Sequence, residues 1–554
     1  MIKVLPFVWF IGHALAAGLC PIYGPVFPPA KNPSSSPSLQ AALGKLKAGL
    51  DDAFATGNSP FGPVVDADTY SIQIFSTAEE GSLFDYHHRG SSLTKGVGAA
   101  EVNGDAVYRM GSVTKIFAVY MLLIQAGIAV FSDLVTKHLP ELSGKPGWEE
   151  ITVGAVAGQI AGVPADVYDL APIAGGSLAD AYPGVFPVLD KEEAAFCIAN
   201  ATQCTRKEFL DELVKRPFTY ASETTPGYSN AAFVVLGLVL ESITGTSWND
   251  NFKTIIIEPL GLNRTAATTP DSSWGVLVGN ETFSGWDIDL SAATAMGGVF
   301  ASATDMSKVG RAILASKLLP QATTRAWLKP TSFTSSLIGA VGRPWEIYRA
   351  SLDPANNRVV DLYTKGGNLG IYDTNLILIP DFNVGVTILS ASEFYSITYG
   401  VSGLVADILI PALEDAAREE AEAAYSGTYT ATNGVNSTVT LSTTPGKPGL
   451  GVEQWISNST NMIELLGSSP ETFRLYPSNT NGAPGESPWR AVSGIDFGYD
   501  LKGPFSACPT WYGVGRPPWG LYGIDAFSFQ LAGDGKAKSL EPKAFKIVLE
   551  REAR

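Results

Sequence analysis

The sequence predicts an α/β (α+β) fold in which one sheet is assembled from both ends of a long domain and an all-β module follows. A helix and a hairpin pattern open the long domain, a helical middle follows, and a second hairpin pattern closes it. From Tyr425 onward Thr, Ser, Gly and aromatic residues dominate, which is typical of all-β modules. The 554 residues are 45% hydrophobic and 17% charged, so the chain has enough apolar side chains for sizeable cores.

The first elements follow from the spacing of apolar residues. Ser38 is the expected cap of a helix in which apolar residues recur every three or four positions, at Leu39, Leu43, Leu46, Leu50 and Phe54. Tyr70–Phe75 alternates as a strand does, and Gly81-Ser82 separates it from a second apolar run at Leu83–Tyr86. These two runs predict a hairpin after the helix.

The later elements are a buried helix, a helical middle and the closing hairpin. Ile116–Val130 is nearly all apolar but too short to span a bilayer, so it predicts a core helix. Residues 150–290 mix helix patterns with long loops. Two apolar runs, Asn375–Pro380 and Val384–Leu389, then flank a turn, and Tyr399–Ala424 is helical. The middle would be an insertion into the sheet.

The amino terminus indicates a compartment. Lys3 precedes the apolar run Val4–Leu15, and Ala14-Leu15-Ala16 has the small-x-small form of a signal-peptidase site. We therefore expect a signal peptide at 1–16, an extended lead-in at 17–37, a main domain at 38–418 and a C-terminal β-rich domain at 419–554. The mature protein would be secreted (extracellular).

Cysteines and sequons fit an oxidising compartment. Cys197 and Cys204 are close enough to close a short loop, and Cys20 would then pair with Cys508. Four cysteines allow two other pairings, so this pairing is a preference. The sequence also holds candidate N-glycosylation sites, at Asn200, Asn263, Asn280, Asn436 and Asn458.

The charge narrows the partners. The formal net charge is −16, which argues against a nucleic-acid partner because phosphate binding needs a positive field. The charged C-terminal end resembles neither a lipid-anchor signal nor a retention signal, so no membrane anchor is expected. A small molecule is then the expected partner, and the oligomeric state stays open.

The sequence gives little support for catalysis with histidine as the base. The chain has 4 histidines, no Gly-x-Ser-x-Gly elbow, no phosphate-binding loop of the Walker type, and no metal-ligand spacing of His, Cys or Glu. The sequence therefore gives no sign of a metal site. A base other than histidine is needed, and lysine is the next candidate.

Ser-x-x-Lys occurs twice, and its second copy has a catalytic context. The first, Ser92-Leu-Thr-Lys95, lies in a Gly-rich stretch and fits a chance match. In the second, Ser112-Val-Thr-Lys115, Gly111 leads directly into the apolar helix. Residues three apart on a helix share one face, and burial lowers the pKa of a lysine toward the range of a proton acceptor.

Two later segments complete the set. Tyr228-Ser-Asn230 precedes another apolar helix, Val234–Leu240, and Lys365-Gly366-Gly367 lies just before the late hairpin, where an edge strand could flank a pocket. Each segment alone has a plain structural explanation, as a turn or a strand approach. The three motifs in this order favour a site.

With these motifs the chain resembles the serine β-lactamase and penicillin-binding-protein superfamily, most closely its class C, esterase and D-peptidase branch. The resemblance covers about residues 40–415 and implies an antiparallel sheet flanked by helices with a helical subdomain. It implies that Ser112 attacks a carbonyl to form an acyl-enzyme, with Lys115 and Tyr228 sharing the acid and base roles. Substrate binding would fall to Asn230, Lys365, Gly367 and Asn368, with the N–H groups of Ser112 and Asn368 forming the oxyanion hole.

The sequence departs from the family at two places. Gly366 stands where many β-lactamases have Thr or Ser, and Gly158-Gln-Ile-Ala-Gly162 replaces a His/Tyr-Thr-Ser/Ala-Gly loop. Both changes weaken the case for β-lactam hydrolysis. We expect hydrolysis of an ester, lactone or amide with a small, apolar acyl group, and the resemblance implies no metal or organic cofactor. Two alternatives stay open: an acyltransferase using the same acyl-enzyme, and a catalytically idle binding protein that kept the fold.

Overall fold

The computed structural model describes most of the chain. It covers residues 19–169, 178–190, 193, 197, 204–354, 357–393, 398–480, 482–493, 508 and 510–553. The predicted signal peptide at 1–16 lies outside the described residues. The chain divides into two compact units: the larger contains Gly44–Arg349 and Asp361–Asp407, and the smaller contains the described residues up to Leu43, Ala350–Val360 and everything from Ile408 onward. The domain limits expected from the sequence stay predictions.

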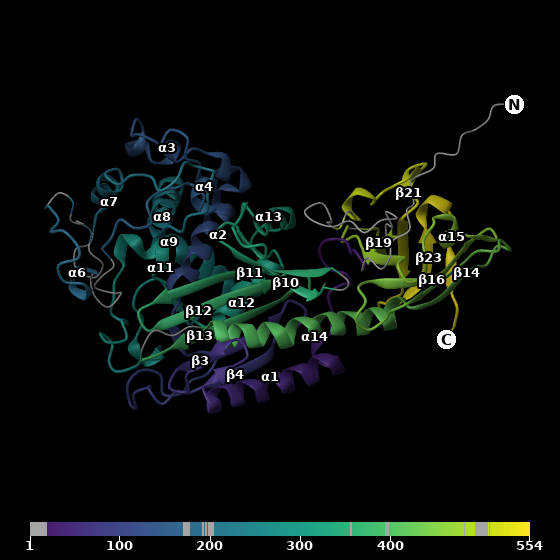
Figure 1. Cartoon of the computed structure of the whole chain (residues 1–554), viewed down its shortest axis with the longest axis horizontal. Coiled ribbons are helices and arrows are strands. Elements are labelled where there is room, and N and C mark those ends of the chain that lie inside the picture. The colour runs from purple at the N-terminus through teal and green to yellow at the C-terminus, as the bar shows by residue number, and fades with distance from the viewer. Residues whose placement is uncertain are drawn as a thin grey trace. The chain divides into compact units, whose positions relative to one another are not determined.

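The predicted sheet built from both ends of the domain is confirmed. Eight strands form a sheet in the order β4-β3-β13-β12-β11-β10-β9-β8, so strands from the beginning of the domain pair with strands from its end (Figure 1). Their bounds are β3 Thr69–Ser76, β4 Ser82–His88, β8 Ser332–Phe333, β9 Gly339–Val341, β10 Glu346–Asp353, β11 Arg358–Leu369, β12 Tyr372–Ile379 and β13 Val384–Ala391. The strands from the two ends of the domain meet in the antiparallel pair β3–β13, in which Ile72 faces Ile388.

Helices cover both faces of this sheet. On one face Phe54 of α1 (Pro37–Thr56) packs against Tyr70 of β3, with ring centroids 5.2 Å apart. On the other face α12 (Ala303–Leu314) lies so close that Gly310 leaves no room for a side chain beside Phe75. Helix α1 starts one residue before the predicted Ser38, because Ser36 rather than Ser38 caps it by accepting from the N–H of Leu39.

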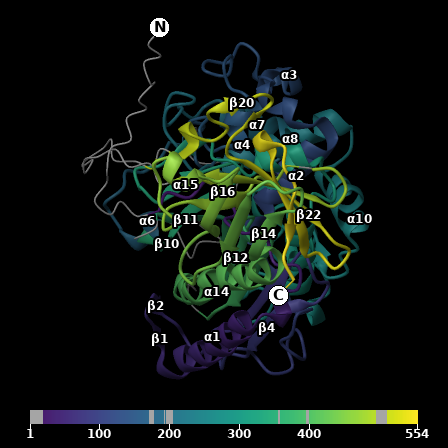
Figure 2. The same cartoon turned by 90° about the vertical axis from the view of Figure 1, so that its right-hand side faces the viewer.

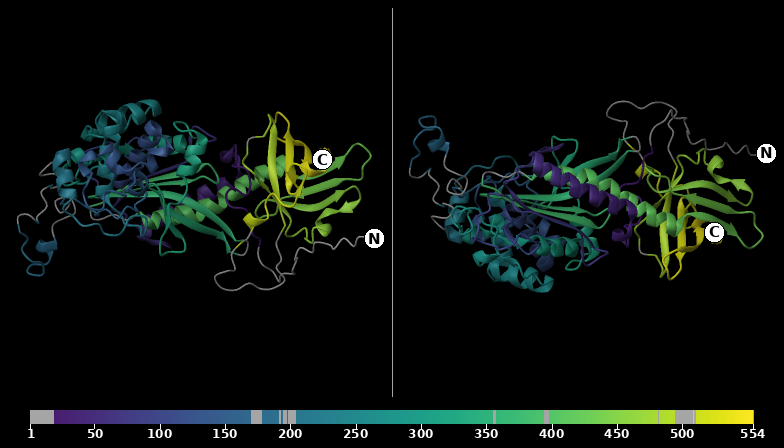
Figure 3. Two further views of the ribbon diagram at one scale, coloured as in Figure 1. Left: turned by 90° about the horizontal axis from the view of Figure 1, so that it is seen from above. Right: turned by 90° about the horizontal axis from the view of Figure 1, so that it is seen from below.

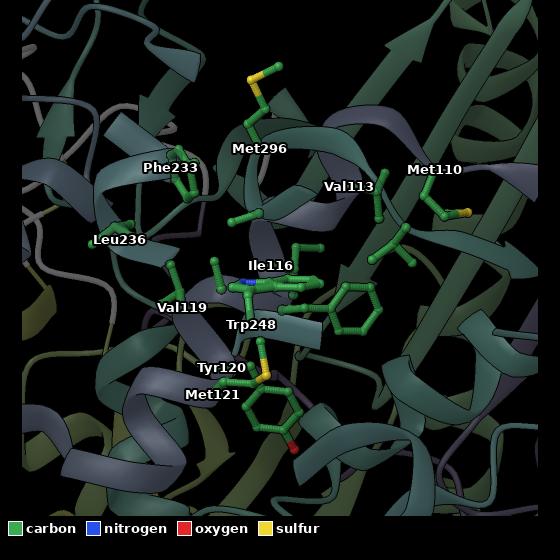
Figure 4. Packing of buried hydrophobic residues seen from close by; sticks show 14 of the residues in the cluster. Met110, Val113, Ile116, Val119, Tyr120, Met121, Phe233, Leu236, Trp248 and Met296 are labelled. Atoms are coloured by element: carbon green, nitrogen blue, oxygen red, sulfur yellow. The ribbon is translucent and has the colours of Figure 1, made fainter. Parts of the chain in front are cut away.

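The helical middle packs around α2 (Thr114–Ala126). Figure 4 shows Ile116 and Val119 of α2 surrounded by Phe233 and Leu236 of α8 (Asn230–Thr244), with Trp248 and Met296 from further helices. The prediction that this helix runs to Val130 is wrong, because Gly127 adopts φ +68° and ends it at Ala126. A short sheet, β5-β7-β6, also lies here and was not predicted; its strands are Val107–Arg109, Phe300–Ser302 and Thr265–Ala266.

The remaining helices are short, apart from the one that leads into the C-terminal module. They are α3 Val135–His138, α4 Val153–Ala157, α6 Leu178–Ala181, α7 Arg206–Leu213, α9 Trp248–Phe252, α10 Glu258–Leu260, α11 Thr294–Gly297, α13 Gln321–Trp327, α14 Tyr399–Tyr425 and α15 Met462–Leu465. Among the described residues no single helix is both long and apolar enough to cross a membrane, although the bent pair Asn230–Thr244 and Trp248–Leu260 would satisfy length and composition together.

The predicted all-β module is confirmed as a barrel-like sheet. Nine strands follow the order β15-β14-β24-β23-β22-β19-β18-β16-β17, and an added β15–β16 pairing closes eight of them into a ring. The curled strands are seen in light green to yellow in Figure 2 and Figure 3. Their bounds are β14 Gly427–Ala431, β15 Thr438–Ser442, β16 Leu450–Ser457, β17 Thr460–Asn461, β18 Arg474–Pro477, β19 Glu486–Val492, β22 Ala526–Leu531, β23 Ala537–Pro542 and β24 Leu549–Arg551. Aromatic rings, among them Trp455, Trp489 and Phe529, fill the interior.

The preferred cysteine pairing is also found. Cys20 bonds to Cys508 and Cys197 bonds to Cys204. Of the five sequon asparagines, Asn200 lies outside the described residues and the other four, Asn263, Asn280, Asn436 and Asn458, are exposed. Their glycosylation stays a prediction.

Candidate active site

Ser112 lies in a single helical turn, Gly111–Val113, immediately before α2. Lys115 follows one turn later and is completely buried, with its Nζ 2.9 Å from Ser112 Oγ. The Ser-x-x-Lys spacing therefore places both groups on one face of the helix, as the sequence predicted.

The turn that carries Ser112 packs directly against strand β11. Gly111 has φ +47°, and a side chain there would approach the backbone nitrogen of Asn368 to 2.8 Å. A side chain on Gly367 would lie 2.1 Å from the carbonyl oxygen of Met110 and 2.8 Å from the nitrogen of Ser112. Only glycine fits at both positions. This close packing brings the backbone nitrogens of Ser112 and Asn368 to one junction between the turn and the strand.

The ammonium group of Lys115 is surrounded by acceptors. Besides Ser112 Oγ, its Nζ donates to Asn230 Oδ1 at 2.8 Å and to the carbonyl oxygen of Met296 at 2.5 Å. A lysine ammonium has three donors, so all of them are used. Burial lowers the pKa of Lys115, and the neighbouring Lys365 lowers it further, while Tyr228 acts in the opposite direction.

Tyr228 and Asn230 enter the site from the segment that starts α8. Ser229 caps this helix by accepting from the N–H of Ala232. Its own N–H donates to Gln159 Oε1 at 2.9 Å, so the divergent loop Gly158–Gly162 holds the segment in place. Tyr228 Oη lies 2.6 Å from Ser112 Oγ, and Asn230 Nδ2 donates to Asp166 Oδ1 at 2.9 Å.

The phenol of Tyr228 lies between two cations. Its ring is 5.1 Å from the Nζ of Lys115 and 5.3 Å from the Nζ of Lys365. Desolvation alone would raise the pKa of Tyr228, but the two ammonium groups outweigh it and hold this pKa below its ordinary value.

Lys365 lies on β11 and is paired with a carboxylate. Its Nζ donates to Glu346 Oε1 at 2.5 Å and to the carbonyl oxygen of Gly366 at 2.7 Å. Burial alone would lower the pKa of Lys365, yet Glu346 and Tyr228 raise it above its usual value. The expected edge strand at this motif is wrong: β11 lies between β12 and β10, and β9 and β8 continue the sheet beyond β10.

These groups line one cavity of about 450 Å³. Six of the seven predicted site residues face it, namely Ser112, Tyr228, Asn230, Lys365, Gly367 and Asn368, and the seventh, Lys115, lies buried beneath Ser112. Apolar and aromatic side chains complete the lining, among them Leu290, Met296, Leu369, Tyr348 and Tyr399. Within the described part of the chain no group of three or more His, Cys, Asp or Glu side chains is arranged to hold a metal ion.

Comparison with known proteins identifies the family. A family model described as Beta-lactamase matches residues 76–396, and a model described as Beta-lactamase-like-like, C-terminal domain, matches residues 417–553. The chain belongs to the β-lactamase family. A "Beta-lactamase-like protein" of Arthroderma benhamiae is 30% identical over 519 residues, which is 86% of this chain and 84% of that protein.

Two more distant similarities are found. A "Probable hydrolase M10" of a Phoma species is 24% identical over 411 residues, 72% of this chain and 67% of that protein. Among solved structures, a class C β-lactamase from Rhodobacter sphaeroides is 15% identical with a TM-score of 0.47, and the match covers 66% of this chain and 98% of that one.

Sequence reasoning on this β-lactamase-family chain missed two carboxylates of the site. Glu346 pairs with Lys365, and Asp166 fixes the amide of Asn230. Glu346 is 19 residues from its partner and Asp166 is 64 residues from its partner, so no local spacing links them. The one available signal was the strand character of the segment that contains Glu346.

Proposed function

We propose that this protein is a secreted serine hydrolase that cleaves ester, lactone or amide bonds through an acyl-enzyme on Ser112. The observation that carries the proposal is the double contact of Ser112 Oγ, which lies 2.9 Å from Lys115 Nζ and 2.6 Å from Tyr228 Oη at the edge of the cavity. Few structural roles require a serine hydroxyl to meet a buried ammonium and a phenol together.

The arrangement favours Tyr228 as the proton acceptor. The ammonium of Lys115 already donates to three acceptors, so it has no free position as a base while it is charged. The phenol has a lowered pKa and is bonded to the nucleophile. Ser112 Oγ would attack the carbonyl as its proton passes to Tyr228, and Lys115 would stabilise the phenolate before and the alkoxide during this step.

The later steps use the same groups. The N–H groups of Ser112 and Asn368 would stabilise the oxyanion of the tetrahedral intermediate. The protonated phenol of Tyr228 would then give its proton to the leaving alcohol or amine, which leaves Ser112 acylated. Tyr228 would take a proton from the water that attacks the ester, and it would return a proton to the released Ser112 Oγ.

Secretion belongs to the same proposal. The two disulfide bonds are compatible with an extracellular protein, because disulfides persist in oxidising compartments. The exposed sequon asparagines and the apolar amino-terminal run support the same compartment.

A hydrolysis assay with matched variants tests the proposal. Purified protein should release para-nitrophenol from para-nitrophenyl esters, and Ser112→Ala and Lys115→Ala should each lower kcat/KM by about 10³-fold or more, since the groups act as a unit. The control is the other Ser-x-x-Lys: Ser92→Ala and Lys95→Ala should retain the activity.

The same assay separates the alternatives. Added propanol that shifts the product from acid to propyl ester at a constant rate of phenol release would indicate an acyltransferase. If the folded protein turns over no acyl substrate, and Ser112→Ala does not differ from the native chain, the catalytically idle binding protein is the alternative that stands.

A further inference from the structure

The cation that faces the cavity at Lys365 is already neutralised by the protein. Its Nζ lies 2.5 Å from Glu346 Oε1. The ammonium is nearly inaccessible, with 2% of the side chain exposed, while 35% of the Glu346 side chain is exposed and lines the cavity. A group entering the cavity therefore meets the carboxylate before the ammonium.

Glu346 is held rigidly by the backbone of the same strand pair. Its second oxygen, Oε2, accepts from the N–H of Gly366 at 2.9 Å. A Cβ on Gly366 would lie 3.4 Å from the same oxygen, which is an ordinary van der Waals contact, so it is the N–H of Gly366 that holds the carboxylate. Thr364 Oγ1 also donates to the backbone oxygen of Glu346 at 2.7 Å. Both carboxylate oxygens are thus fixed.

A second acidic group lies on the same part of the lining. Asp373 of β12 faces the cavity and accepts from the N–H of Thr398 at 2.6 Å. Burial raises the pKa of Asp373, the hydrogen bonds from Thr398 oppose this rise, and the negative charge of Glu346 adds to it. The hydroxyl of Tyr348 is subject to the same negative charge of Glu346.

The other charged groups of the site do not give the cavity lining a positive charge. Among the described residues, the charged or titratable groups around the nucleophile are Lys115, Tyr228, Lys365, Glu346, Tyr348, Asp373, Tyr399 and Asp166. Lys115 uses its donors on the protein, and Asp166 uses its Oδ1 on Asn230. An anion would therefore find no unpaired cation among the described residues that line the cavity.

We propose that Glu346 is a specificity-determining residue, which makes this site select acyl substrates without a carboxylate and reject those that place a carboxylate near Lys365. The inference rests on the proposed function. A carboxylate at that position would have to displace Glu346 or lie beside it, and like charges at short range are strongly unfavourable. A neutral or cationic acyl group meets no such repulsion.

Three rigid substrates of one shape test the proposal. They are the para-nitrophenyl esters of para-methylbenzoic acid, of terephthalic acid (free carboxylate) and of para-(aminomethyl)benzoic acid, none of which can cyclise. The native protein should hydrolyse the neutral ester with a kcat/KM at least about tenfold above that of the anionic ester, and the cationic ester should be accepted.

Two variants separate charge from shape. Glu346→Gln keeps the size and removes the charge, so the ratio of anionic to neutral kcat/KM should rise at least about tenfold, mainly through KM. Glu346→Asp keeps the charge, so this ratio should stay low. An unchanged ratio in Glu346→Gln overturns the proposal. A preference of the native protein for the anionic ester also overturns it, and that measurement does not depend on whether a variant folds.

The design also distinguishes the two levels of inference. Turnover of the neutral ester that depends on Ser112 supports the proposed function whatever the ratio is. If none of the three esters is turned over by folded protein, the proposed function fails and the specificity of Glu346 falls with it.

Discussion

At the scale of single residues, the site places one phenol under the influence of two ammonium groups. Tyr228 lies within 5.3 Å of both Lys115 and Lys365, as measured from each Nζ to the ring centroid. The pKa of Tyr228 therefore depends on Lys115 and Lys365 as well as on the phenol itself. The ordinary tyrosine pKa of about 10 would leave little phenolate at neutral pH.

Removing one of these cations should shift the pH profile. If phenolate Tyr228 is the base, kcat/KM rises as the pH rises through the pKa of Tyr228. Lys365→Met removes a charge that lowers this pKa, so the acidic limb should move to higher pH. The pH dependence of kcat/KM on a neutral ester measures the shift.

A distant lysine provides the control for that profile. Lys95→Met removes an exposed ammonium outside the cavity and should leave the limb in place. A limb that stays unmoved in Lys365→Met, with activity still measurable, would contradict the assignment of Tyr228.

The sequence predicted the residues with local patterns and missed those without them. Ser112 and Lys115 were readable because three positions on a helix share a face. The pairs Lys365–Glu346 and Asn230–Asp166 were not, because strand pairing and a distant loop create them. The hydrogen bond from the N–H of Gly366 to Glu346 was not predictable either, because Glu346 lies on the neighbouring strand.

At the scale of elements, the site depends on how the turn before α2 meets β11. Met110 O accepts from Thr374 Oγ1 at 2.9 Å, which ties the turn to β12 as well. Gly111 and Gly367 allow the backbone of the turn to contact the backbone of the strand at this junction. An added methyl group at either position has no space.

Gly367→Ala tests that junction. The new methyl group would lie 2.1 Å from the Met110 oxygen, so the strand or the turn must move and Ser112 with it. We expect kcat/KM to fall by about 10²-fold or more, because displacements of about 1 Å can have this effect. Ester hydrolysis measures the loss.

Gly44→Ala is the matched control, since a side chain at Gly44 in α1 meets no atom within 4 Å. It should leave activity unchanged. Full activity in Gly367→Ala would contradict the tight junction.

Element prediction from sequence succeeded where the periodicity was long and regular. The late hairpin was predicted within a few residues of β12 and β13, and the helix at Tyr399–Ala424 differs from α14 by one residue. It failed at Val130, where Gly127 ends the helix by its backbone conformation, and at β5, β6 and β7, whose two or three residues carry no periodicity. The position of β11 inside the sheet depends on β8–β10, which a single-strand pattern does not reveal.

At the scale of the whole molecule, the described residues up to Leu43 and those from Ile408 onward belong to the same compact unit. The bond between Cys20 and Cys508 spans 488 positions, whereas Cys197–Cys204 spans 7. In the chain-entropy description a cross-link stabilises more when it closes a longer loop.

Removing the long-range bond should therefore destabilise the C-terminal unit. The double variant Cys20→Ala, Cys508→Ala should lose about 2–4 kcal/mol of unfolding free energy, seen as a lower Tm under oxidising conditions. The matched variant Cys197→Ala, Cys204→Ala should lose less. Equal or reversed losses would contradict the loop-length argument.

The central claim is that Ser112 is an activated nucleophile, and covalent labelling tests it most directly. Purified protein should react with a fluorophosphonate probe, and peptide mass mapping should place the label on Ser112. Ser112→Ala and Lys115→Ala should both remove the label, while Ser92→Ala should keep it. Absence of label on folded native protein, or a label on another serine, would contradict the claim.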